Sequence, residues 1–203
     1  MCDIIGRDRE IADFQRIYKS KKAEFVVVFG RRRVGKTFLV SELYKDDMCF
    51  YHTGLTPVEQ CGKEDELRNF SFSLAHYGLK INKIPDNWLD AFELLIHLVS
   101  SKPSVKGKRK VIFIDEMPWM DTPKSGFITG FEHFWNGWAS KQKDVMLIVC
   151  GSATSWISDN LINNHGGLYN RVTQQIKLSP FTLKECKLYY KNFGSLKYRK
   201  KYY

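Results

Sequence analysis

The sequence of 203 residues predicts an α/β fold, a three-layer sandwich in which helices cover both faces of a five-stranded parallel sheet. Apolar segments with strand character alternate along the chain with segments of helical periodicity. Two of the apolar segments are continuous rather than alternating, as strands covered on both faces are. A glycine-containing turn also joins the first strand directly to a helix, which is typical of a parallel α/β arrangement.

Five segments carry the strand pattern. Residues 25–29 are entirely apolar, and residues 48–52 follow the first strand and its helix. Residues 111–114 and 145–150 are the continuous apolar runs, which we expect to be covered on both faces of the sheet. Residues 172–178 form the weakest segment. All of these runs are far shorter than the roughly 20 apolar residues that a membrane-spanning helix needs.

The predicted helices lie between and after these strands. The helix from Trp88 follows Pro85 and Asp86, which are residues typical of a helix start. An aromatic cluster at helical spacing predicts core packing, although Trp135 and Trp138 could instead belong to a partner surface. The predicted helices are residues 37–44, 59–76, 88–100, 127–141, 154–162 and 182–193, and the aromatic cluster is Phe131, Phe134, Trp135 and Trp138.

Length and composition limit the class of protein. The chain is long enough for one buried core and too short for two sizeable domains. Its five cysteines are widely spaced and form no C-x-x-C pair, which argues against a disulfide framework or a zinc site. The first residues show no signal-peptide pattern. We therefore expect a soluble, cytoplasmic protein that does not contact a membrane.

The net charge of +10 raises the question of nucleic acid as a partner, because a basic surface attracts phosphate backbones. Much of the excess is local. Four cations and no acid lie in residues 195–203, and Arg31, Arg32 and Arg33 lie in the glycine-containing turn. We predict a core domain over residues 1–194 and a disordered basic tail over residues 195–203. Charge alone does not favour a dedicated nucleic-acid surface.

The turn after the first strand fits the phosphate-binding loop pattern G-x-x-x-x-G-K-[ST]. Phosphates need converging backbone N–H groups, and Gly30 and Gly35 allow the chain to curl that closely because they have no Cβ. Lys36 would reach the β- and γ-phosphates, and Thr37 would place its hydroxyl on Mg²⁺. The predicted nucleotide-binding residues of this loop are Gly30, Arg31, Arg32, Arg33, Val34, Gly35, Lys36, Thr37 and Phe38.

Two carboxylates directly follow the predicted strand at residues 111–114. Open α/β sheets bind ligands at the carboxyl ends of their strands, so Asp115 would lie beside the phosphate loop if the two strands are neighbours. Asp115 would then hold Mg²⁺, and Glu116 would polarise the attacking water. An acidic turn without function is the alternative.

Two further candidates follow later in the chain. Ser152, with Thr154 as the alternate, comes after the strand at 145–150 and could either sense the γ-phosphate or cap the next helix. Arg171 precedes the last strand, where an arginine could reach the γ-phosphate of a neighbouring copy. A surface salt bridge is the simpler interpretation of Arg171.

Taken together, these motifs resemble P-loop ATPases of the AAA+/STAND group, and more narrowly the archaeal-type ATPases of prokaryotes. The resemblance covers residue 4 to about residue 193. It implies that Ile5, Gly6 and Arg7, in the N-terminal element Gly6, Arg7 and Glu10, lie against the adenine. It also implies a sensor role for Ser152 and an arginine-finger or sensor role for Arg171, with a homo-oligomer formed through Arg171. The implied ligands are ATP or ADP with Mg²⁺.

Such ATPases carry a small helical lid after the core, and the residues after Phe193 are too few for one. We interpret the chain as a truncated family member. The expected function is Mg²⁺-dependent hydrolysis of the β-γ phosphate bond of ATP, with Lys36, Glu116, Ser152 and Arg171 as catalytic residues. Two alternatives stay open. One is a nucleotide-binding regulatory or interaction module without efficient turnover, and the other is a DNA-associated ATPase.

Overall fold

The computed structural model describes residues 4–56, 61–163 and 165–191. Its centre is a five-stranded sheet in the order β2-β3-β4-β1-β5, and every neighbouring pair is parallel. The strands are β1 (Glu24–Phe29), β2 (Met48–Thr53), β3 (Lys110–Asp115), β4 (Val145–Gly151) and β5 (Gln174–Lys177). The predicted fold class is therefore confirmed.

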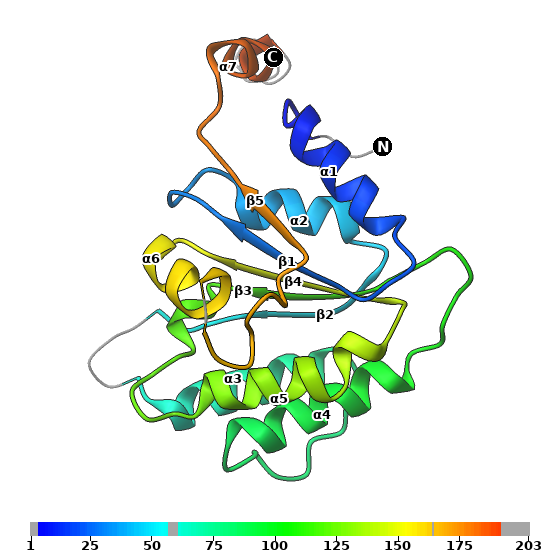
Figure 1. Cartoon of the computed structure of the whole chain (residues 1–203), viewed down its shortest axis with the longest axis vertical. Helices are drawn as coiled ribbons and strands as arrows, with labels where there is room; N and C mark the ends of the chain where they lie inside the picture. Colours follow the sequence, from blue (N-terminus) through cyan, green and yellow to red (C-terminus); the bar gives the residue numbers. More distant parts are fainter. Residues whose placement is uncertain (1–3, 57–60, 164, 192–203) are drawn as a thin grey trace, which may run out of the picture.

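Helices form the two outer layers of the sandwich (Figure 1). One face of the sheet is covered by α1 (Asp8–Tyr18) and α2 (Lys36–Tyr44), and the other by α3 (Lys63–His76), α4 (Trp88–Ser101) and α5 (Phe127–Gly137). The short α6 (Thr154–Ile157) joins this second layer, because Ile157 is buried in the same core. The last helix, α7 (Leu183–Tyr189), lies beyond the sheet on the side of α1.

Each face of the sheet has its own hydrophobic core, and successive side chains of β1 alternate between the two cores. Val26 and Val28 are buried with Phe14 of α1 and Leu39 of α2, whereas Phe25 and Val27 belong to the core on the other face. On that second face Phe25 packs against the rings of Phe131 and Trp135, at centroid separations of 5.6 and 5.0 Å. The predicted aromatic cluster is thus part of the core, although Trp138 is only partly buried.

The sheet order places β4 between β1 and β3. The phosphate loop after β1 and the carboxylates after β3 are therefore not on neighbouring strands, so the condition attached to the Asp115 prediction is not met. Since all strands run in one direction, the loops after β1, β3 and β4 still emerge at the same edge of the sheet. That edge carries the candidate site.

Several predicted boundaries are wrong. The predicted helix at 127–141 ends as an α-helix at Gly137 and continues with the 3₁₀ turn Ala139–Lys141. The one at 154–162 is α-helical only over Thr154–Ile157 and then widens into the π-helical turn Ser158–Ile162. Of the helix predicted over residues 59–76, residues 59 and 60 lie outside the described residues, and the helix begins at Lys63; β5 is shorter than residues 172–178.

Helix α1 is absent from the prediction, although Ile11, Phe14, Ile17 and Tyr18 follow helical spacing and Phe14 and Ile17 are buried. The predicted basic tail and the end of the last predicted helix lie outside the described residues. Within them, none of the helices is long and apolar enough to cross a membrane. The cysteines described, Cys49, Cys61, Cys150 and Cys186, are free thiols.

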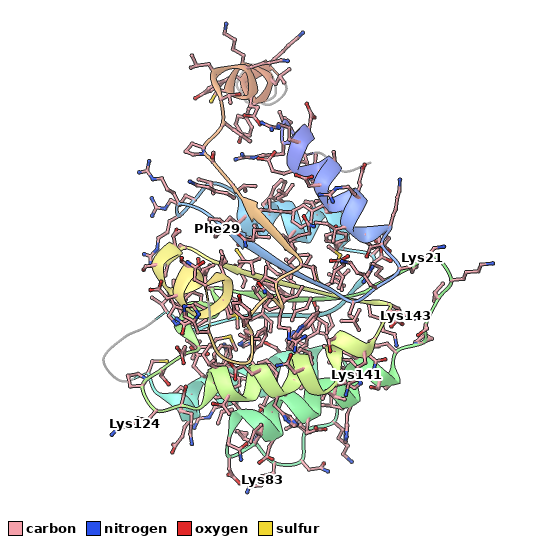
Figure 2. The ribbon with its side chains drawn as sticks, in the orientation of Figure 1. Lys21, Phe29, Lys83, Lys124, Lys141 and Lys143 are labelled. Atoms are coloured by element: carbon pink, nitrogen blue, oxygen red, sulfur yellow. The ribbon has the colours of Figure 1, made fainter. Side chains whose placement is uncertain are left out.

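The basic side chains are spread over the molecule. Figure 2 shows Lys21 and Lys143 at the right of the ribbon, Lys124 at its lower left and Lys83 at its bottom. The basic side chain of Arg109, in contrast, lies in the interior and stabilises the fold. The Arg109 guanidinium is buried and donates to the carbonyls of Lys22 and Val145, which ties the start of β1 to the start of β4.

Candidate functional site

The phosphate loop connects β1 to α2, and its backbone requires glycine at two positions. Gly30 has φ of 150°, and a Cβ there would overlap the carbonyl oxygen of Leu178. Gly35, at the start of α2, has φ of 90°. Both values lie where L side chains are strained, so these residues set the curl of the loop.

Lys36 is held inside this curl. It is only 5% exposed, and its Nζ donates hydrogen bonds to the carbonyl oxygens of Gly30 and Arg31, at 3.1 and 3.0 Å. An ammonium held by loop carbonyls next to the N-terminus of α2 makes this end of the helix electropositive. The local arrangement suits an anion with several oxygens.

The loop meets β3 across the intervening strand. The Thr37 hydroxyl donates to Oδ2 of Asp115 at 2.5 Å, and the backbone N–H of Glu116 donates to Oδ1 of Asp115 at 2.9 Å. Asp115 is 3% exposed. Burial raises the pKa of the neighbouring Cys150 thiol well above its usual value, and the negative charge of Asp115 raises it further. This thiol therefore stays neutral.

Glu116 turns away from the strand direction in a left-handed conformation, with φ of 45°. Its Oε2 accepts hydrogen bonds from the backbone N–H and the hydroxyl of Ser152, both at 3.2 Å. Ser152 therefore contacts the predicted catalytic carboxylate and does not cap α6, whose N-cap is Ala153 without a side-chain hydrogen bond. Arg32 is also part of this hydrogen-bonded group of Glu116 and Ser152, because its Nε donates to the Ser152 hydroxyl at 3.2 Å.

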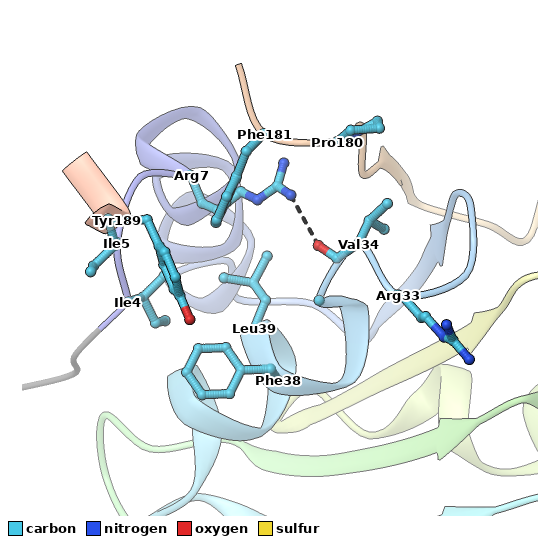
Figure 3. A pocket seen from close by; sticks show the side chains of 11 residues that line it. Ile4, Ile5, Arg7, Arg33, Val34, Phe38, Leu39, Pro180, Phe181 and Tyr189 are labelled. Atoms are coloured by element: carbon cyan, nitrogen blue, oxygen red, sulfur yellow. Dashed lines mark hydrogen bonds between the residues drawn. The ribbon is translucent and has the colours of Figure 1, made fainter. Parts of the chain in front are cut away.

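A largely apolar cavity of about 600 Å³ lies next to the loop, between α2 and the segment after β5 (Figure 3). Figure 3 shows the rings of Phe38, Phe181 and Tyr189 around it, while the Arg33 side chain points away from the apolar side chains. The lining residues are Ile4, Ile5, Arg7, Arg33, Val34, Gly35, Phe38, Leu39, Pro180, Phe181 and Tyr189. A flat aromatic or heterocyclic group fits such walls.

Arg7 holds the walls of this cavity together. Its guanidinium donates to the carbonyls of Ser179, at 2.7 Å, and Val34, at 3.0 Å, and lies 4.5 Å from the ring centroid of Phe181. Its backbone N–H donates to Oε1 of Glu185 at 3.0 Å. The N-terminal segment, the phosphate loop and the segment after β5 therefore meet at one side chain.

The structure brings most of the predicted site residues together at the carboxyl edge of the sheet. Arg171 is the exception. It is exposed and precedes β5, where the backbone N–H of Thr173 bonds to Phe25 at the start of β1, whereas the phosphate loop follows the other end of β1. Gly6 faces Glu185 rather than the apolar cavity, because a Cβ on Gly6 would lie 2.8 Å from the Glu185 Cγ.

The cavity residues Ile4, Leu39, Pro180, Phe181 and Tyr189 were not predicted. One local signal was available. Thr182 and Glu185 have the spacing of a capping box, and the structure shows the reciprocal bonds, which fix the chain just after Phe181. The spacing predicts a helix start but says nothing about the cavity to which Phe181 belongs.

The donor set fits Mg²⁺. The Thr37 hydroxyl and the Asp115 carboxylate are hard oxygen ligands, which this ion prefers, and they already lie within hydrogen-bonding distance. Among the described residues there is no group of three His, Cys, Asp or Glu that could hold a metal ion unaided. An ion held here would therefore share its coordination with phosphate oxygens and water.

Comparison with known proteins identifies relatives of the chain. The model of a family described as an ATPase domain predominantly from Archaea matches residues 4–201. An uncharacterized protein of Methanocaldococcus jannaschii is 24% identical over 186 residues, which cover 92% of this chain and 38% of that protein.

Among solved structures, a Walker-type ATPase of Pyrococcus abyssi aligns with a TM-score of 0.67 and 15% identity, over 96% of this chain and 59% of its own. The Aeropyrum pernix ORC2 protein, solved as ADPNP and ADP complexes, aligns with a TM-score of 0.55 and 14% identity, over 90% of this chain and 51% of its own. These likenesses confirm the fold. The chain spans less than two thirds of the length of each of these proteins.

Proposed function

This chain belongs to the family of ATPase domains found predominantly in Archaea, and we propose that it binds ATP and hydrolyses the bond between its β- and γ-phosphates with the aid of Mg²⁺. The observation that carries the proposal is the hydrogen bond between Thr37 and Asp115, which joins the phosphate loop to the carboxylates after β3 across β4.

Binding divides between two regions of the site. The backbone N–H groups of the loop and the Lys36 ammonium would hold the phosphates, while the apolar cavity beside Val34 and Phe181 would hold the base. Arg7 would support the base region indirectly, since its guanidinium is already bonded to Ser179 and Val34. The contact role proposed for Ile5 agrees with its place in the cavity wall.

Thr37 and Asp115 would hold Mg²⁺, which when bound supplies charge neutralisation on the phosphate oxygens. Glu116 would orient a water for attack on the γ-phosphorus. As the oxygen of that water bonds to phosphorus, the bond from phosphorus to the bridging oxygen breaks, ADP leaves with the electron pair, and Glu116 takes the proton of the water. Oε1 of Glu116 has no hydrogen-bond partner among the described residues, so it is available for this water.

Isothermal titration with ATP, ADP and GTP in the presence of Mg²⁺ tests the binding step. We expect Lys36→Ala to weaken ATP binding by about ten- to a hundred-fold, because it removes a charge-assisted hydrogen bond to phosphate. Lys45→Ala, at the exposed C-terminal end of the same helix, is the control and should bind ATP like the wild type. Equal binding by Lys36→Ala and the wild type would contradict the assignment.

A phosphate-release assay tests the chemical step. Glu116→Gln should lower kcat by at least about a hundred-fold with little change in ATP affinity, because a positioned general base contributes on that scale. Glu93→Gln, an exposed carboxylate on α4, is the matched control. If the wild type binds ATP tightly but does not hydrolyse it, the alternative is favoured. In that nucleotide-dependent interaction module, Glu116 would stay hydrogen-bonded to Ser152.

A further inference from the structure

The Arg32 side chain extends from the phosphate loop over the ends of two other strands. Its Nε donates to the Ser152 hydroxyl after β4 at 3.2 Å, and its Cζ lies 5.7 Å from the ring centroid of Trp119, in the turn after β3. These contacts come from segments 87 and 120 residues away in the sequence, so tertiary structure rather than the loop itself sets the direction of this side chain.

The charge of Arg32 is not neutralised by the protein. Its described polar contact is to a neutral hydroxyl, and among the described ion pairs none involves Arg32. A guanidinium keeps several N–H donors after giving one to Ser152, and their planar arrangement matches phosphate oxygens. The hydroxyl that receives the Arg32 bond also donates to Glu116, the carboxylate that would orient the attacking water.

The neighbouring loop arginine Arg33 is oriented differently. Arg33 lines the apolar cavity, and Figure 3 shows its guanidinium pointing away from the other lining side chains. The described contact of Arg31 is its backbone carbonyl, which accepts from Lys36. Arg32 is thus the loop arginine with a described side-chain contact at the carboxylate end of the site.

We propose that Arg32 binds the γ-phosphate within its own chain, so that the site discriminates triphosphate from diphosphate and stabilises the negative charge of phosphoryl transfer. This inference rests on the proposed binding of ATP. In it, Arg32 supplies in the same subunit the cation that the family resemblance assigned to Arg171, which lies near the opposite end of β1. The Arg32 bond to Ser152 gives way to bonds with the γ-phosphate when a triphosphate binds.

The test compares the affinities for ADP and for a non-hydrolysable triphosphate, AMP-PNP, by isothermal titration with Mg²⁺. Arg32→Ala should weaken AMP-PNP binding by about ten-fold or more and leave ADP binding within about two-fold of wild type. Arg32→Lys should recover part of the difference, because it restores the charge without the planar fork. Arg68→Ala, an exposed arginine on α3, is the control and should change neither affinity.

Turnover gives a second measurement, in which Arg32→Ala should lower kcat by about a hundred-fold at saturating ATP. Equal weakening of ADP and AMP-PNP, or no change in either, would overturn the role of Arg32 while leaving ATP binding intact. A wild type that binds neither nucleotide would overturn the proposed function as well. Thermal melting of each variant separates these results from a loss of folding.

Discussion

At the scale of single residues, Glu66 of α3 is a buried carboxylate outside the proposed site. It is 1% exposed, its Oε1 accepts the backbone N–H of Leu55 at 2.9 Å, and its Oε2 finds no partner among the described residues. Burial raises the pKa of Glu66 to about 7, although the hydrogen bond from Leu55 acts in the opposite direction. Leu55 follows Gly54, whose backbone N–H donates to the Asp115 carbonyl. Through Leu55 and Gly54, Glu66 is therefore connected to the backbone of the proposed site.

A raised pKa in the folded state makes stability depend on pH in a defined direction. Folding favours the protonated carboxyl, so this stabilisation is complete below the usual value near 4.5 and is lost as the pH rises through about 7. Between pH 5 and pH 8 the wild type should lose up to about 3 kcal/mol relative to Glu66→Gln, measured by urea unfolding. The control Glu64→Gln, at an exposed position of the same helix, should show the same dependence of stability on pH as the wild type. Parallel curves for the wild type and Glu66→Gln would contradict this prediction.

The residues of the site differ in how far the sequence reveals them. Lys36, Thr37 and Asp115 could be predicted, because the loop pattern and the carboxylates after an apolar strand are local signals. The link from Arg32 through Ser152 to Glu116 could not, because it depends on where three strand ends lie in space. No local pattern encodes the direction of an exposed side chain.

At the scale of helices and strands, the five strands could be predicted and their order could not. Hydrophobic runs such as the one in β4 show that a strand is buried, but not which strands lie beside it. The predicted helix boundaries were wrong where tertiary packing, rather than local helix propensity, determines the end of the helix. In α5 the helix ends at Gly137, and Trp138, with φ of −130°, opens a 3₁₀ turn that brings the buried Ala139 into the core.

The packing of α4 on α5 depends on one glycine within a helix. A Cβ at Gly130 would lie 2.9 Å from the Cβ and 3.0 Å from the backbone carbon of Trp88, which is 1% exposed. Gly130→Ala should destabilise the protein by about 2 kcal/mol, since overpacking outweighs the better helix propensity of alanine.

Gly137 provides the matched control in the same helix. A Cβ there would lie 3.9 Å from the His133 ring, which is an ordinary contact. Gly137→Ala should therefore be neutral or stabilising in the same thermal or urea unfolding experiment. If Gly130→Ala were also neutral, α4 and α5 would not be packed as closely as the structure shows.

At the scale of the whole molecule, the first and last described segments meet at the cavity. Arg7 bonds to Ser179 and Glu185, partners 172 and 178 residues away. Hydrogen bonds from the Thr182 and Arg7 backbone lower the pKa of Glu185, so this carboxylate stays ionised at neutral pH. The cavity is therefore formed by segments from both ends of the described chain.

Arg7→Lys tests this union of the two ends. A lysine keeps the charge but cannot bond to Ser179 and Val34 with one planar group, so we expect a loss of stability of about 2 kcal/mol. The affinities for ADP and AMP-PNP should fall by equal factors, because the base region is common to both. Arg9→Lys, the exposed neighbour on α1, should behave like the wild type. Unequal changes in the two affinities would contradict the role given to Arg7.

The meeting of residues 4–7 with residues 179–189 also sets an order of events during synthesis. When the ribosome has released the phosphate loop, the carboxylates after β3 and the intervening strand β4, the wall formed by Phe181 and Tyr189 has not yet been made. The strands that carry the phosphate loop and the carboxylates are therefore synthesised before the residues that close the cavity wall. The cavity proposed to hold the base is therefore fully lined only in a chain that has been translated through Tyr189.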